Sequence, residues 1–314
     1  MVILLFLALS YSVIMAILKD LIEYQGSMAL IRNFLGEEIN ISDSFRELDG
    51  KELIIENCPN LKTIEANNCG LVDLFIDECP KLEYLKVYNN DLKELDVADN
   101  SNLKFVRANY NKLESVDVSG CENLLELECA GTKYFSRIKE LDLTDCKKLK
   151  KLVCYHNSIK ELEVKHLKDL EYLQCQDNYL QELDVSDLAN LNELNCSGMV
   201  SISGGGLSKL NLDGCKSLEV LDCAENCLNE LDLVVLPKLH TVSARENSLE
   251  QLTAKNCPNL GYLDANCQAV NDLSLTDELI PECRMFIDNC GNLRVLYYES
   301  TATFYSNGKN RSNL

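Results

Sequence analysis

The stretch LEYLQCQDNYLQELDVSDLAN, residues 170–190, decides the fold of this chain. It contains two short apolar segments, L-x-x-L-x-C and L-x-x-L-D-V, which are separated by a turn. Leu173 and Cys175 alternate with polar residues, which places both on one face of an extended strand. Leu183 and Val185 do the same in the second segment. Neither segment can bury its leucines alone, so the stretch requires neighbours of the same kind.

Such neighbours recur along the chain with a period of 21 residues. Ten leucines open an equivalent segment, at successive spacings of 21, 21, 21, 25, 21, 21, 27, 21 and 21: Leu61, Leu82, Leu103, Leu124, Leu149, Leu170, Leu191, Leu218, Leu239 and Leu260. Repeats of this length stack so that each contacts only the next. The pattern predicts a solenoid, either mostly β or of α/β type. We expect about ten to eleven coils, with a parallel sheet on the concave side and short extended segments on the convex side.

The repeat divides the chain into three predicted parts. Residues 1–52 form an apolar segment and a helical lead-in that caps the array, residues 53–298 form the solenoid, and residues 299–314 form a short polar tail. Two repeats carry insertions of four and six residues, in the loops 130–140 and 197–209. These loops are either relaxed joints or additional recognition surface.

Composition excludes several classes of function. The chain of 314 residues has 30 Lys and Arg against 50 Asp and Glu, a formal charge of −20, which disfavours nucleic acid as a partner. Apolar residues make up 46%, enough for an ordered core. Outside the array there is too little chain for a catalytic domain, and no G-x-S-x-G or H-E-x-x-H motif occurs. We therefore expect no enzyme activity and no cofactor.

The repeated segments resemble the leucine-rich repeat family. Its diagnostic L-x-x-L-x-L-x-x-N-x-L pattern appears as LEYLKVYNNDL, LKFVRANYNKL, LKKLVCYHNSI, LEYLQCQDNYL, LEVLDCAENCL and LHTVSARENSL. The 21-residue period is most similar to the short class called IRREKO. The resemblance covers about three quarters of the chain and implies a concave parallel sheet and a role in binding proteins, without identifying the partner.

Most of the 16 cysteines fall into two columns of the repeat. One column occupies the last inward position of the first strand: Cys129, Cys154, Cys175, Cys196 and Cys223. The other column lies three residues before the first leucine of the next repeat: Cys58, Cys79, Cys121, Cys146, Cys215, Cys257 and Cys290. Other repeats have Val, Ala or Leu there, so these positions require a small apolar side chain. No C-x-x-C pair occurs near the three histidines, which argues against a metal site. We expect reduced thiols.

Two polar columns have structural interpretations. An asparagine column can satisfy backbone groups in the turns, and we expect a structural ladder of Asn90, Asn111, Asn157, Asn178, Asn226 and Asn247. A carboxylate column lies within the second strand, between its leucine and the following Val or Leu, and is expected to point outward: Asp96, Asp117, Asp142, Glu163, Asp184 and Asp232. Stacked carboxylates can hold calcium, but a solvated convex face is the more common arrangement.

The outward positions of the first strand vary between repeats, and aromatic and basic residues collect in the first six coils. Tyr and Arg contribute much of the energy of protein interfaces. The predicted partner-binding residues are therefore Tyr84, Lys86, Tyr88, Phe105, Arg107, Lys151, Tyr155, Tyr172 and Gln174. The alternative is that they are tolerated surface residues.

Residues 2–18, VILLFLALSYSVIMAIL, form an uncharged apolar run. Seventeen residues is the lower limit for crossing a bilayer and long for a signal-peptide core. Four interpretations stay open: a membrane anchor, an export signal, a helix that caps the first coil and continues through residues 19–45, or a misassigned start, since Met28 could also begin the protein. If the run is an anchor, Lys19 on its C-terminal side favours a solenoid that faces the cytoplasm, which agrees with reduced cysteines. If the run is a signal peptide, the protein is exported.

Together these patterns predict a monomeric, non-catalytic module that binds a protein partner on its concave face. One alternative is an exported or surface-attached adhesin or host-interacting protein of the same fold. A second is the substrate-recognition arm of an enzyme complex.

Overall fold

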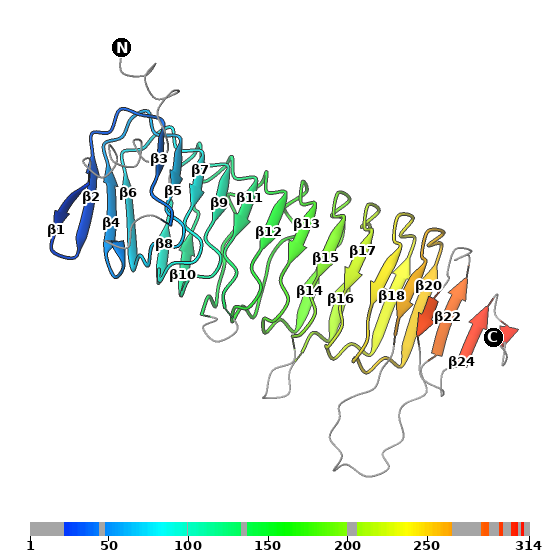
Figure 1. Ribbon diagram of the computed structural model, residues 1–314. Coiled ribbons are helices and arrows are strands. Elements are labelled where there is room, and N and C mark those ends of the chain that lie inside the picture. Colours follow the sequence, from blue (N-terminus) through cyan, green and yellow to red (C-terminus); the bar gives the residue numbers. More distant parts are fainter. Residues whose placement is uncertain are drawn as a thin grey trace, which may run out of the picture. The chain divides into compact units, whose positions relative to one another are not determined.

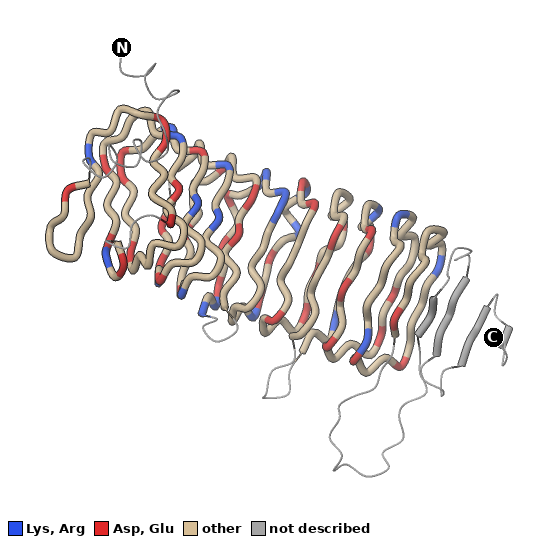
Figure 2. Tube along the Cα trace, in the orientation of Figure 1, with Lys and Arg blue, Asp and Glu red and all other residues tan. Residues whose placement is uncertain are grey.

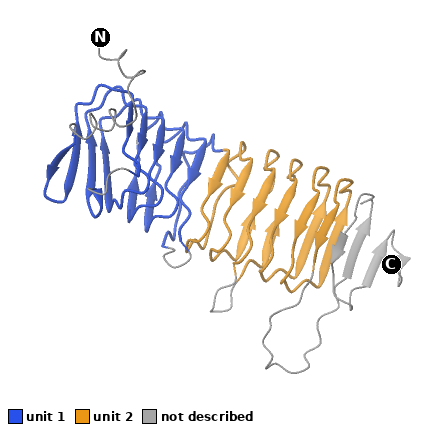
Figure 3. Cartoon of the chain, in the orientation of Figure 1, with its two compact units in different colours: residues 1–149 blue, residues 150–314 orange. Residues whose placement is uncertain are grey.

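Most repeats of the sequence form one turn of backbone with two short strands on opposite sides (Figure 1). The computed structural model describes residues 22–43, 48–98, 100–132, 137–199 and 206–265, and the backbone of the last four strands. It divides into two compact units, residues 1–149 and 150–314 (Figure 3). Each unit is a parallel-sheet solenoid, and the chain makes about 11 turns in all. No α-helix occurs in the described residues, which confirms the mostly β solenoid rather than an α/β one.

The first strand of each turn pairs in parallel with the first strand of its neighbours. In the first unit these strands are β3 (Glu38–Asn40), β5 (Thr63–Glu65), β7 (Tyr84–Lys86), β9 (Phe105–Arg107) and β11 (Glu126–Glu128). In the second unit they are β12 (Lys151–Val153), β13 (Tyr172–Gln174), β15 (Glu193–Asn195), β17 (Val220–Asp222), β19 (Thr241–Ser243), β21 (Tyr262–Asp264) and β23 (Val295–Tyr297). The register follows the repeat, since Tyr84 lies opposite Phe105 and Tyr172 opposite Glu193. We call the outward side of these strands the first-strand face.

The other side of each turn carries shorter sheets. In the first unit these are β1 (Glu23–Gln25), β2 (Met28–Arg32), β4 (Glu52–Glu56) and β6 (Asp73–Asp77), and the pair β8 (Glu94–Asp96) and β10 (Ser115–Asp117). In the second unit they are the pair β14 (Glu182–Asp184) and β16 (Lys209–Asn211), and β18 (Glu230–Val234), β20 (Gln251–Lys255), β22 (Arg284–Asp288), β24 (Thr303–Ser306) and β25 (Lys309–Asn310). β1 and β25 run antiparallel to β2 and β24, whereas the other pairs are parallel.

The core lies between the two sides of each turn. In the repeat at 170–190, the side chains of Leu173, Cys175, Leu180 and Val185 are fully buried. Burying one leucine contributes about 1.5–3 kcal/mol, so two leucine rows running through successive turns supply most of the driving force. Backbone hydrogen bonds join the turns, for example from Tyr172 N to Lys150 O at 3.0 Å.

The helical lead-in predicted over residues 19–45 is wrong for the described residues 22–43, which form β1, β2 and β3. The reason is pairing: Ala29 and Ile31 point into the core and lie opposite Leu53 and Ile55 of β4. Extended backbone here continues the sheet, which a helix cannot do.

Several other expectations concern the ends and the insertions. The apolar run 2–18 and the insertion residues 133–136 and 200–205 lie outside the described residues. Within the described part, no helix is long and apolar enough to cross a membrane. The segment 299–314, expected as a short polar tail after the solenoid, contributes β24 and β25 to the sheet that holds β22.

Candidate binding surface

The first-strand face is built by alternation within three-residue strands, from which β12 departs because Val153 is buried as well as Leu152. In β7 the central residue, Leu85, is fully buried, while Tyr84 and Lys86 on either side are half-buried and point outward. The same pattern holds in β9, where Val106 is buried between Phe105 and Arg107. The sheet therefore displays two outward rows of side chains, and the register places each residue beside its counterpart in the next turn.

Tyr84 and Phe105 form an aromatic stack on this face. Their ring centroids are 4.9 Å apart and the ring planes differ by 4°. The two residues are register partners, so the sheet itself holds the rings side by side. Both residues are partly exposed, so the stack can contact another molecule.

The basic residues beside the stack already have carboxylate partners. Lys86 forms an ion pair with Glu65, one turn earlier. Arg107 Nη2 lies 3.2 Å from Glu126 Oε2, and its Nε lies 3.7 Å from Glu128 Oε1. The row before the strands repeats this arrangement, with Lys62 paired to Glu37 and Lys104 to Glu83. Figure 2 shows the same interleaving of acidic and basic residues along the strands. The face around the stack is thus close to charge-balanced rather than basic.

Tyr88 lies just past β7, with 38% of its side chain exposed. Its backbone N–H donates to Asn67 Oδ1 at 3.2 Å, which fixes the backbone while the ring stays available to solvent. Tyr88, Tyr84 and Phe105 therefore make up the aromatic part of the face in the first unit.

The second unit carries a smaller group. Lys151 Nζ lies 5.7 Å from the centre of the Tyr172 ring, a cation–π distance, and Gln174 Nε2 donates to Tyr172 Oη. Tyr155 meets His156 edge to face at 5.1 Å. All four predicted residues of this unit therefore lie within two neighbouring turns, each with a contact that orients its side chain.

The asparagine column is buried and fully hydrogen-bonded to backbone. Asn178 is 1% exposed; its Nδ2 donates to Cys175 O and to Cys154 O of the previous turn, both at 3.0 Å. Its Oδ1 accepts the Ile159 N–H at 3.0 Å. Asn90, Asn111, Asn226 and Asn247 repeat this set of bonds, and Asn157 donates to Cys154 O. Five members of the column therefore each tie a turn to the one before it, whereas the bond from Asn157 to Cys154 O lies within one turn: Asn90, Asn111, Asn178, Asn226 and Asn247.

One position of this column was missed in the sequence, and a second buried asparagine lies beside it. Cys69 stands where the next turn has Asn90, and its Sγ lies 3.2 Å from Ile41 O and 3.3 Å from Asn67 O, so its one S–H can donate to either carbonyl. Asn67 is also buried and bonds to Ser42 Oγ. The 21-residue spacing between Cys69 and Asn90 was the available signal, since a thiol can donate one of the two amide hydrogen bonds.

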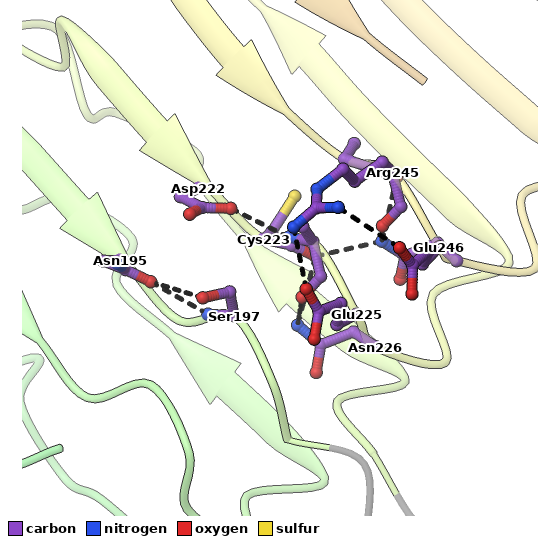
Figure 4. A network of polar contacts seen from close by, with 11 residues as sticks. Asn195, Ser197, Asp222, Cys223, Glu225, Asn226, Arg245 and Glu246 are labelled. Carbon is purple, nitrogen blue, oxygen red and sulfur yellow. Dashed lines mark hydrogen bonds and ion pairs between the residues drawn. The ribbon is translucent and has the colours of Figure 1, made fainter. Parts of the chain in front are cut away.

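A second polar network lies where β17 and β19 end (Figure 4). Arg245 joins two carboxylates, with Nη2 2.8 Å from Glu225 Oε1 and Nη1 3.2 Å from Glu246 Oε1. Below it, the Asn226 amide donates to Cys223 O at 3.1 Å. Asp222 Oδ1 accepts the Ala224 N–H at 3.2 Å. The contact between Arg245 and Glu225 joins two successive turns, whereas the other contacts stabilise a single turn.

The carboxylate column has a turn-forming role rather than only a solvated one. Asp96, Asp117, Asp142 and Asp184 each accept, through Oδ1, the backbone N–H two residues later, at 2.9–3.0 Å. Such bonds close the turn that follows the second strand. Among the described residues, no group of three or more His, Cys, Asp or Glu side chains is placed to hold a metal ion.

The thirteen described cysteines are free, and twelve of them are buried. Burial raises the pKa of Cys175 to about 12 and that of Cys215 to about 11. Several thiols donate to carbonyls of the previous turn, as Cys121 does to Val97 O at 3.2 Å. Cys175 and Cys215 are therefore protonated at neutral pH and poor nucleophiles. Cys227 is the exposed exception in the described part.

Comparisons with known proteins agree with this geometry. Residues 81–225, less than half of the chain, match the family model described as plant disease resistance protein RPS2-like, leucine-rich repeats. No curated protein sequence matches the chain. The functional domain of InlJ from Listeria monocytogenes, described as including a cysteine ladder, is 24% identical, with a TM-score of 0.58. That match covers 88% of this chain and 64% of the InlJ domain, so the chain spans less than two thirds of it.

Two further solved structures are more distant. An internalin (inlF) from Listeria monocytogenes is 13% identical over 90% of this chain and 88% of its own, with a TM-score of 0.49. A leucine-rich repeat protein from Leptospira interrogans is 16% identical over 78% and 80%, with a TM-score of 0.41. Leucine-rich repeat families are typically non-catalytic interaction scaffolds. The repeat, the paired sheets and the family match together show that this chain is built as a leucine-rich repeat solenoid.

Proposed function

We propose that the chain is a non-catalytic module that binds a protein partner on its first-strand face. In the first unit the contact residues are Tyr84, Tyr88 and Phe105, flanked by Lys86 and Arg107. In the second unit they are Lys151, Tyr155, Tyr172 and Gln174. The net charge of −20 supports a protein rather than a nucleic acid as the partner.

The stacked pair of Tyr84 and Phe105 is the observation that carries this proposal. Two aromatic rings held 4.9 Å apart by the sheet are already ordered, so a partner that covers them need not first restrict their rotation. Their charged neighbours are paired with one another, which limits the desolvation cost at the rim. Preorganised aromatic residues surrounded by paired polar groups are typical of interface hot spots.

The test replaces three aromatic residues of the face together: Tyr84→Ala, Phe105→Ala and Tyr172→Ala. A partner first captured with the unchanged chain is purified, and its affinity for both forms is measured by calorimetry. We expect at least a hundredfold weaker binding, because hot-spot truncations cost about 2 kcal/mol or more each.

The matched control is a second triple variant with exposed aromatic residues that lie off this face: Tyr24→Ala, Tyr110→Ala and Tyr179→Ala. It should bind as the unchanged chain does. Circular dichroism must show that both variants keep their β structure. Unchanged affinity in the first triple variant would move the interface away from the first-strand face.

A further inference from the structure

The charges of the first-strand face are paired in most of its turns. Three positions of each turn line this face: the residue before the strand, and the first and third residues of the strand. From β5 to β13, every carboxylate at these positions forms an ion pair with a lysine or arginine of an adjacent turn: Glu65, Glu83, Glu126, Glu128 and Glu171. This part of the face therefore neutralises its own acidic groups.

The turns of β15 and β17, in the second unit, break this pattern. Their carboxylates at the same positions are Glu193, Glu219 and Asp222, all of them partly exposed. The sequence has no lysine or arginine at these positions in the turns of β15, β17 and β19. Within the described part of the chain, none of the three carboxylates pairs with a lysine or arginine, and Glu219 has only His240, whose Nε2 lies 4.0 Å from Glu219 Oε2. The face is therefore acidic here.

Arg245, which follows β19, does not compensate for these charges. Its guanidinium group is turned toward Glu225 and Glu246, with N···O distances of 2.8 Å and 3.2 Å (Figure 4). Asp222 instead accepts the Ala224 N–H at 3.2 Å through Oδ1. The nearby arginine thus has carboxylate partners of its own, and Asp222 is held by its own turn.

The acidic part of the face also offers apolar contacts to a cationic side chain. Tyr172, Glu193 and Val220 are register partners in three successive turns, so they follow one another at intervals of about 4.8 Å. Arginine and lysine have an apolar stem and a cationic end, and the stem can cover Tyr172 or Val220 while the cation reaches the carboxylate between them. The Tyr172 ring already takes one cation in this way, from Lys151 at 5.7 Å.

We propose that the partner presents a basic segment, rich in arginine or lysine, to β15 and β17, where its cations pair with Glu193, Glu219 and Asp222. The inference rests on the proposed function and names the chemistry of the partner. In the earlier turns the chain supplies these cations itself, and in these two turns it leaves them to the partner. Among the described residues no group of three or more carboxylate, His or Cys side chains is placed to hold a metal ion, so separate side-chain cations suit these carboxylates better.

The test removes the three charges without changing the size of the side chains: Glu193→Gln, Glu219→Gln and Asp222→Asn. Asparagine at position 222 can still accept the Ala224 N–H. The matched control removes the same number of charges from exposed positions on the other side of the second unit: Glu230→Gln, Asp232→Asn and Glu250→Gln. Circular dichroism checks that both variants keep their β structure.

The first probe is a short fluorescent peptide of alternating arginine and serine, and a peptide of alternating glutamate and serine is its counterpart. Binding is followed by fluorescence anisotropy at several concentrations of NaCl. We expect the arginine peptide to bind the charge-removing variant about tenfold more weakly than the unchanged chain or the control variant, with a smaller effect of salt. The glutamate peptide should not bind. Equal affinity of the arginine peptide for the two variants would overturn the inference, because the attraction would then come from the overall charge of −20.

The second probe is the purified partner, whose affinity for the charge-removing variant should also fall about tenfold. If the aromatic triple variant loses affinity and the charge-removing variant does not, the inference is wrong and the proposed function stands. If neither variant loses affinity, both are wrong. A calorimetric titration with calcium completes the test: binding that the charge-removing variant loses would place a metal ion at these carboxylates and overturn the inference.

Discussion

Val235 is a β-branched residue in a backbone conformation that such residues rarely adopt. Its φ is 57°, in the left-handed region, and half of its side chain is exposed. The equivalent positions one turn earlier and later are Gly214 at 80° and Asn256 at 56°, residue types that adopt this conformation readily. We expect Val235→Asn to raise the free energy of unfolding by about 1 kcal/mol, measured by urea denaturation.

The neighbouring Val234 provides the control for that change. It is the same residue type and is also exposed, but it lies in the regular strand β18. Val234→Asn should lower stability slightly because asparagine is disfavoured in strands. If the change at position 235 also lowers stability, the left-handed backbone there is not strained by valine.

Asn178 makes the second prediction at the scale of single residues. Asn178→Ala removes the side-chain partner of the Cys175 carbonyl and of the Ile159 N–H in a buried turn, whereas Cys154 O keeps its bond from Asn157. Each unpaired group costs about 1–3 kcal/mol, so we expect a loss of about 3 kcal/mol or more in the free energy of unfolding. Asn190, exposed and with a single bond to Lys168 O, is the control; its replacement by alanine should cost about 1 kcal/mol or less. Equal losses would mean that the column is not what joins the turns.

The turns that follow the second strands are stabilised by aspartate side chains, and Asp184 after β14 shows the physical reason. Its Oδ1 accepts the Ser186 N–H at 2.9 Å, and hydrogen bonding to Ser186, with Lys165 nearby, lowers the pKa of its carboxyl group. Asn211 holds the same place in β16 and accepts the same kind of bond from Asp213. Asp184→Ala should therefore cost about 1 kcal/mol at pH 7, and Asp184→Asn less.

The same group gives a pH dependence with a definite sign. Because the folded pKa is lower than the unfolded value of about 3.9, the stabilisation is present above pH 4 and is lost as pH falls through the folded pKa. Asp184→Asn should flatten this part of the acid unfolding curve, followed by circular dichroism. If the acid unfolding curve of Asp184→Asn is the same as that of the unchanged chain, folding does not favour the ionised form of Asp184.

The elements could be predicted where two leucines mark a strand, and not elsewhere. β13 and β14 follow directly from Leu173 and Leu183, because inward leucines at fixed spacing admit no other register. β2 was not predicted as a strand because its apolar residues are consecutive, and a short apolar run does not distinguish a strand from a helix. Alternation also gave the outward position of Lys86. Its ion pair with Glu65 was not predicted, since the choice among neighbouring charges depends on side-chain conformations.

At the scale of the whole molecule, stability is expected to be local, because each turn contacts only its neighbours. Leu173 is fully buried in β13 and lies opposite Leu152 of β12 and Leu194 of β15. Leu173→Ala removes a side chain from a closely packed row, which costs about 2–5 kcal/mol. We expect hydrogen exchange, measured by mass spectrometry, to accelerate in those three strands first.

Strand β21 of the same unit serves as the internal control, since three turns separate it from β13. Its amides should keep their protection in Leu173→Ala, because the lost contacts reach β21 only through intact turns. An equal fall in protection across β12, β13, β15 and β21 would instead mean that the unit unfolds in one cooperative step. In that case the stability of a turn would depend on the whole unit, and any energetic effect of a partner bound at Tyr172 would be shared by every turn of the unit rather than by the nearest ones.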